Sequence, residues 1–218
     1  MAARLELRAI AGIPHCEPGA DLAVIILEAL ARESEALQSG DVLVVAQKIV
    51  SKTEGRYANL NDVVVSAQAR DLAAQADKDP RLVELILSES REVLRVRPGV
   101  IVVEHRNGYV HANAGIDRSN IPQNGEDECA LLLPVDANAS AERLRAKLSA
   151  ESGVEIGVIV SQIMQWCYAL VFKHVPPRFT AFQIVYFHPP AGNGQSLGLK
   201  YGCQHRALYP AVHVNIGV

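Results

Sequence analysis

Hydrophobic and polar residues alternate or recur along most of the chain in patterns that predict both strands and helices. Residues 4–10 (RLELRAI) alternate, which is typical of a half-buried strand. Apolar residues recur at helical spacing over 22–37, with Asp21 as the predicted helix cap, and this pattern ends before Gly40. The apolar run 41–51 (DVLVVAQKIVS) predicts a buried strand that leads into a basic turn, SKTEGR.

The second half of the chain continues this mixture. The remaining predicted elements are an alanine-rich helix at 66–76, an amphipathic helix at 80–90 that opens with Pro80, paired strands around an Asn107-Gly108 hairpin turn, a helix at 140–152 capped by Ser140, and a short strand at 156–161. Strands and helices do not alternate strictly. The predicted fold class is therefore mixed α+β rather than a doubly wound parallel sheet.

The composition changes abruptly after Glu155. All 24 acidic residues lie at or before this position, and the 63 residues that follow contain nine of the eleven aromatic residues. The surface of a folded domain normally mixes both signs of charge. Three alternatives fit such a segment: a small aromatic-rich domain, a membrane- or partner-facing extension, and non-native sequence from a shifted reading frame or a gene junction.

The bulk composition narrows the class of protein. With 218 residues, 49% of them hydrophobic and 21% charged, the chain has an ordinary globular balance. A net charge of −3 without a basic block gives no electrostatic case for nucleic acid. No signal peptide or membrane-spanning apolar run is evident, so we expect a cytoplasmic protein without membrane attachment. Its cysteines are far apart and are expected to be free thiols: Cys16, Cys129, Cys167 and Cys203.

Two polar stretches carry candidate chemistry. In QKIVSKTEGR (47–56), Lys48 and Lys52 are either solvated residues at a strand end or point charges that bind phosphate oxygens. In NAGIDRSN (113–120), Asp and Asn residues favour turns, because their side chains bond the local backbone. The same stretch offers Asp117 as a carboxylate ligand for Mg²⁺, which takes oxygen ligands.

Four motifs occur in the order found in one known family: AGIP, GDVLVVAQKIVSKTEGR, ANAGIDRSN and SAERLRAKL. Over residues 4 to about 161 the chain resembles the coenzyme F-420:gamma-glutamyl ligases. The resemblance implies that family's own mixed α/β fold, a homodimer, and GTP-dependent addition of L-glutamate to the deazaflavin coenzyme precursor. It also implies Mg²⁺ or Mn²⁺ as the metal, with K⁺ as a further candidate cation.

By this resemblance, individual residues take on roles. The residues at the family's nucleotide-binding positions are Ala11, Gly12, Ile13, Pro14, Gln47, Lys48, Lys52 and Asn120, and Asp117 matches a metal-binding aspartate. The implied reaction phosphorylates the terminal carboxylate of the precursor, and glutamate then attacks the acyl phosphate. Such chemistry needs positioned phosphates and a cation more than a protein nucleophile.

The chain departs from the family's pattern directly after Ser161. The family continues with a metal-binding Asp-Thr pair, where this chain has Gln162 and Ile163. We therefore divide the chain into a ligase-like domain, 1–161, and a divergent tail, 162–218, for which a frameshift or gene junction is the first hypothesis. Weak or absent glutamate ligation is expected. The alternative function is an inactive truncated ligase or a non-catalytic protein that binds GTP or the deazaflavin.

Overall fold

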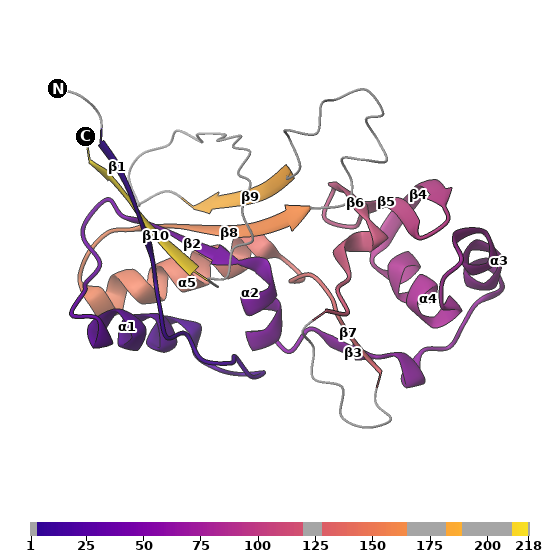
Figure 1. The fold of residues 1–218 in the computed structure, drawn as a ribbon, viewed down its shortest axis with the longest axis horizontal. Helices are drawn as coiled ribbons and strands as arrows, with labels where there is room; N and C mark the ends of the chain where they lie inside the picture. The colour runs from indigo at the N-terminus through magenta and orange to yellow at the C-terminus, as the bar shows by residue number, and fades with distance from the viewer. Residues whose placement is uncertain (1–3, 120–127, 165–181, 189–210, 218) are drawn as a thin grey trace. The chain divides into compact units, whose positions relative to one another are not determined.

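The computed structural model describes residues 4–119, 128–164, 182–188 and 211–217, and these form two compact units (Figure 1). The first unit consists of the chain up to Gly55 and the described residues from Pro134 onward. The second unit is Arg56–Leu133. Each unit has its own hydrophobic core.

A five-stranded sheet forms the centre of the first unit. Its strand order is β1-β10-β2-β8-β9, with bounds Arg4–Ala9, Ala211–Gly217, Val42–Ala46, Gly157–Met164 and Phe182–His188. Strands β2 and β8 run parallel, with Ala46 opposite Ser161, and the other neighbouring pairs are antiparallel. Two described segments of the acid-free tail, β9 and β10, thus lie in this sheet.

Three helices complete the first unit: α1 (Leu22–Arg32), α2 (Gln47–Thr53) and α5 (Ala137–Ser152). Figure 1 shows α1 and α5 along the same side of the sheet, where both contribute to one core. Ile26 of α1, Leu43 of β2 and Leu148 of α5 are fully buried there. This packing fixes the carboxyl ends of β2 and β8. Helix α2 begins directly after β2.

The second unit contains two small sheets and two helices. Its strands are β3 (Tyr57–Asn59), β7 (Cys129–Leu131), β4 (Ser90–Arg97), β5 (Val100–His105) and β6 (Val110–Ala112), with 3-10 turns η1 (Leu60–Asp62) and η2 (Asn113–Gly115). Strand β3 pairs with β7, and β4-β5-β6 form the other sheet. Helices α3 (Ala67–Ala76) and α4 (Pro80–Ser88) pack against β5.

The α+β class and most of the predicted elements are confirmed. Pro80 opens α4, and Ser66 caps α3 through a bond from the Ala69 amide. The predicted hairpin turn joins β5 to β6, with Gly108 at φ +87. Of the four cysteines, Cys16 and Cys129 lie among the described residues, and neither forms a disulfide bond there.

Several predicted boundaries are wrong. The strand predicted to run through Ser51 ends at Ala46, because Gln47, Val50 and Ser51 are buried at helical spacing and form α2. The helix predicted to reach residue 37 ends at Arg32, and Ser34 then takes a left-handed conformation.

Ser140 was predicted to be a helix cap, but α5 begins three residues earlier. Asp136 is the cap, and its side chain accepts a hydrogen bond from the Ala139 amide at 2.9 Å. Ser140 lies inside the first turn, and its hydroxyl makes different contacts, which are described below.

Candidate functional site

The carboxyl end of the parallel pair β2–β8 is the first element of the candidate site. Ligands of open α/β sheets commonly bind beyond the carboxyl ends of parallel strands. Here β2 ends at Ala46, opposite Ser161 of β8, and α2 begins at the next residue, Gln47. The predicted nucleotide-binding residues Gln47 and Lys48 therefore follow directly after this sheet edge.

Helix α2 has an unusually polar buried side. Gln47 and Ser51 are buried and hydrogen-bond to each other, and Lys52 is only 8% exposed. Lys48 is half-buried and lies four residues before Lys52, so the two side chains project from the same helix face. Lysine is rarely buried in protein cores. Because Lys52 is only 8% exposed, the alternative that it is a solvated surface residue is wrong.

The AGIP loop, Ala11 to Pro14, follows β1 in the same unit. Gly12 has φ +70, which favours glycine, and its carbonyl accepts a bond from Arg32 Nη1 at 3.1 Å. Ile13 packs against the core.

The chain after AGIP joins helix α2. The Gly19 amide donates to the Thr53 carbonyl at 2.8 Å. Burial raises the pKa of the Cys16 thiol, and the positive charge of Lys52 opposes this rise. The structure therefore brings the segment that contains AGIP together with α2.

Asp117 is positioned in the second unit by a strained turn. Asn113, Ala114 and Gly115 all have left-handed φ values of +51, +51 and +70. Left-handed residues other than glycine are costly, and such strain often occurs at functional sites. The Asn113 side chain stabilises the turn by accepting a hydrogen bond from the Ile101 amide at 3.0 Å.

The backbone of Asp117 is held on both sides. Its amide donates to the Leu131 carbonyl at 3.0 Å, and its carbonyl accepts from the Leu131 amide at 2.8 Å. Oδ1 of its carboxylate accepts bonds from the Ser119 amide at 2.9 Å and from the Ser119 hydroxyl at 2.8 Å. These bonds to a residue two positions later form the local turn that the sequence predicts for Asp and Asn residues, and they hold the carboxylate in one orientation.

Asp117 offers one carboxylate as a possible ligand of a divalent cation. Within the described part of the chain, no group of three or more His, Cys, Asp or Glu residues could hold a metal. Mg²⁺ is often bound by one or two carboxylates together with nucleotide phosphates.

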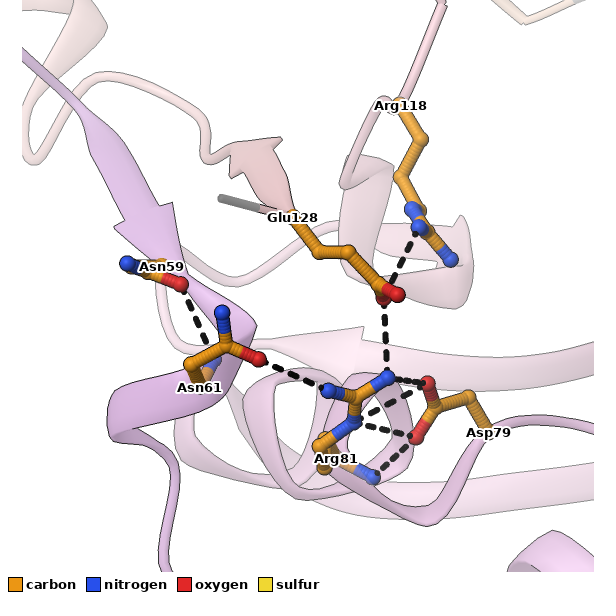
Figure 2. Close-up of polar contacts among 6 residues, drawn as sticks. All are labelled: Asn59, Asn61, Asp79, Arg81, Arg118 and Glu128. Atoms are coloured by element: carbon orange, nitrogen blue, oxygen red, sulfur yellow. Dashed lines mark hydrogen bonds and ion pairs between the residues drawn. The ribbon is translucent and has the colours of Figure 1, made fainter. Parts of the chain in front are cut away.

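A network of polar and charged residues is centred on Arg81 and includes Arg118, the residue that follows Asp117 (Figure 2). The Arg81 guanidinium contacts Asp79 at 2.6 Å, Glu128 at 2.8 Å and Asn61 at 3.1 Å. Arg118 reaches the same oxygen of Glu128 at 3.4 Å. Asp79 caps α4, and Glu128 immediately precedes β7. Arg81 therefore connects α4 to β7, whose Leu131 pairs with Asp117.

A second ionic cluster surrounds Glu89 and includes a motif residue whose role the sequence did not indicate. Arg56, the last residue of SKTEGR, donates to the Leu133 carbonyl at 2.8 Å and to Glu89 at 3.3 Å. Glu89 is 4% exposed and also contacts Arg106 at 3.2 Å, and His105 lies 3.6 Å away. Arg56 is therefore a structural residue of the second unit. Its distant partner Glu89 left no local signal in the sequence.

The predicted site residues fall into two groups. Ala11, Gly12, Ile13, Pro14 and the three residues of α2 belong to the first unit, and Asp117 belongs to the second. Asn120 lies outside the described residues, as do Cys167 and Cys203. None of the described helices is long and apolar enough to cross a membrane.

The fold defines a mixed α+β protein with buried polar side chains on α2. Comparison with known families gives a more specific assignment. Residues 12–177 match the family described as F420-0:Gamma-glutamyl ligase, and the chain belongs to this family. The match extends beyond Ser161, where the recognisable motifs end.

Several archaeal proteins named Coenzyme F420:L-glutamate ligase are similar to this chain. The protein of Methanothermobacter thermautotrophicus is 43% identical over 157 residues, which is 72% of this chain and 61% of that protein. The Methanopyrus kandleri protein is 43% identical over 144 residues, or 66% and 54% of the two chains. The Haloarcula marismortui protein is 40% identical over 163 residues, or 72% and 60%. The chain thus matches just over half of the length of these relatives.

Proposed function

We propose that this chain is a GTP-dependent ligase that adds L-glutamate to the deazaflavin precursor of coenzyme F420 through γ-linked amide bonds. Membership of the ligase family supports the reaction class. The observation that carries the nucleotide part is Lys52, 8% exposed on a helix that starts at the carboxyl end of β2. A buried ammonium group at such a position is suited to phosphate.

The proposed reaction activates a carboxylate, which is a poor acyl donor. The precursor's terminal carboxylate attacks the γ-phosphorus of GTP, the bond to the β–γ bridging oxygen breaks, and GDP leaves. The glutamate amine then attacks the acyl phosphate carbon, phosphate leaves, and the amine loses a proton to solvent.

In this proposal Lys48 and Lys52 bind phosphate oxygens, and Gln47 and the AGIP loop bind the nucleotide. Asp117 holds Mg²⁺ or Mn²⁺. When bound, the cation would neutralise negative charge on the phosphoryl oxygens.

A second candidate function is binding of GTP or the deazaflavin without turnover. The observation that favours it is the continuation of β8 through Gln162 and Ile163, where the family resemblance implies metal-binding Asp-Thr. An amide carries no negative charge, and isoleucine has no ligand atom. We therefore expect slow ligation at most.

The experiment combines a binding assay with an activity assay on the same preparations. Calorimetric titration with Mn²⁺–GTP measures binding, and mass spectrometry of the deazaflavin measures addition of glutamate, with K⁺ present or absent. Lys52→Met should weaken nucleotide binding about tenfold to a hundredfold, because a charged hydrogen bond contributes about 1.5–3 kcal/mol. Asp117→Asn should reduce the dependence of GTP binding on Mn²⁺.

Matched controls are Lys78→Met and Asp77→Asn, which change lysine and aspartate residues at the end of α3. Nucleotide binding without glutamate addition would support the second candidate. Binding that is equally strong in Lys52→Met and wild type would refute the nucleotide assignment. Light scattering of the same samples tests the homodimer, which is also part of the proposal.

A further inference from the structure

Two motifs that lie far apart in the sequence meet at the C-terminal end of α2. SKTEGR contributes Glu54, the C-cap residue of α2, and SAERLRAKL contributes Ser140 and Arg143 of α5. The Ser140 hydroxyl donates to Glu54 Oε1 at 2.5 Å, and Arg143 Nη2 donates to the same oxygen at 2.7 Å. Arg143 also donates to the Ser140 hydroxyl at 3.0 Å, which closes a triangle of contacts.

The triangle is placed where it can control the position of α2. Ser140 is 5% exposed and the Glu54 side chain is 26% exposed, whereas the Arg143 side chain is 65% exposed, so the bond between Ser140 and Glu54 is the shielded contact of the triangle. Shielded charge-assisted hydrogen bonds are stronger and more directional than exposed ones. Helix α5 packs into the core through Leu144 and Leu148, so it is a rigid support for the carboxylate.

Helix α2 needs such a support because it has only seven residues, and Ala46 at its N-cap has no hydrogen-bonding side chain. Short helices are marginally stable by themselves, and their stability comes from tertiary contacts. At its C-terminal end, the Gly19 amide bonds the Thr53 carbonyl at 2.8 Å, and the triangle holds the next residue, Glu54.

We propose that Glu54, Ser140 and Arg143 are positioning residues that hold α2 so that Lys48 and Lys52 face the nucleotide phosphates. The inference rests on the proposed function, since it gives these lysines a task. None of the three residues touches the substrate in this scheme. They act through α2, and their loss lets the helix shift while the lysines remain present. A displacement of about 1 Å can reduce the efficiency of a site about a hundredfold.

The test uses the full chain and three variants. Glu54→Ala removes both contacts to α5. Glu54→Gln keeps a carbonyl oxygen that can accept from Ser140. Ser140→Ala removes the hydroxyl, which contacts Glu54 and also lies 2.9 Å from the Asp136 carbonyl. The control is Glu142→Gln, which removes a carboxylate that pairs with Arg145 at 2.7 Å within α5.

Two measurements separate positioning from simple loss of stability. Hydrogen–deuterium exchange mass spectrometry of residues 47–55 reports the order of α2 directly, and titration with Mn²⁺–GTP reports the consequence for binding. We expect Glu54→Ala and Ser140→Ala to speed exchange in α2 while α1 stays protected, and to weaken Mn²⁺–GTP binding about tenfold or more. Glu54→Gln should recover part of both losses, and Glu142→Gln should match wild type.

The possible failures are distinguishable. If wild type binds no Mn²⁺–GTP, the proposed function fails, and the inferred role in nucleotide binding fails with it. If wild type and Glu54→Ala bind equally well while Lys52→Met does not bind, the proposed function stands and the positioning role is refuted. Unchanged exchange in α2 after Glu54→Ala would overturn the inference whatever the binding result.

Discussion

The left-handed turn before Asp117 should depend on a single side chain, that of Asn113. Its Oδ1 atom accepts a hydrogen bond from the Ile101 amide at 3.0 Å, and Ile101 is fully buried in the core of the second unit. Asn113 is also the first of three left-handed residues, and asparagine tolerates that conformation better than other residues with a side chain. Replacing it removes a hydrogen bond and a conformational preference together.

The expected loss can be divided between these two effects. A buried amide left without an acceptor costs about 1–3 kcal/mol. A left-handed alanine adds about 1 kcal/mol. Asn113→Ala should therefore lower the free energy of unfolding of the second unit by about 2–4 kcal/mol. Asn113→Gly loses the hydrogen bond but adopts the left-handed conformation freely, so it should be less destabilised than the alanine variant.

Urea denaturation followed by circular dichroism measures the stability, and hydrogen exchange at Ile101 assigns the loss to this turn. The control is Asn138→Ala, an exposed position on α5 where alanine favours the helix. The reasoning is refuted if Asn113→Ala unfolds within about 0.5 kcal/mol of wild type, the usual range for surface substitutions. Equal destabilisation of the Gly and Ala variants would show that backbone strain plays no part.

Three further predictions follow from the ionic groups and from the change in composition. Burial alone would raise the pKa of Glu89, but His105, Arg106 and Arg56 outweigh it and hold this pKa below its usual value of 4.5. The stabilisation is therefore complete above the unfolded-state pKa and is lost as the pH falls through the lower folded-state pKa. As the pH is lowered, the free energy of unfolding should fall less for Glu89→Gln than for wild type. An equal fall in the two proteins would contradict this prediction. Arg81→Gln should lower the urea midpoint more than Arg118→Gln, because Arg81 contacts three partners and Arg118 makes one 3.4 Å contact with Glu128. If the acid-free segment arose by a frame change, the gene should be resequenced and translated in its other reading frames, and one of them should encode Asp-Thr directly after Ser161. Its absence from every frame would exclude a frameshift.

The predicted elements were most accurate where one local signal decides the structure. Pro80 fixes the start of α4, and Gly108 provides the left-handed residue of the β5–β6 turn. The sequence pattern wrongly predicts a strand for residues 47–51, which form part of α2, because the local signal is ambiguous. The β-branched residues Ile49 and Val50 resemble the continuation of a strand, and the residues buried at helical spacing include polar Gln47 and Ser51. Only the tertiary environment makes these positions the inner face of a helix.

The same limit applies to the charged residues of the SKTEGR motif, which have different tasks although they lie within five positions. Lys52 is buried on α2, Glu54 is held by α5, and Arg56 binds the Leu133 carbonyl and Glu89. A charged residue within a family motif can bind a ligand or can hold the fold together. The partners of Glu54 and Arg56 lie between 33 and 89 residues away in sequence. Their structural roles therefore become visible only in the folded chain.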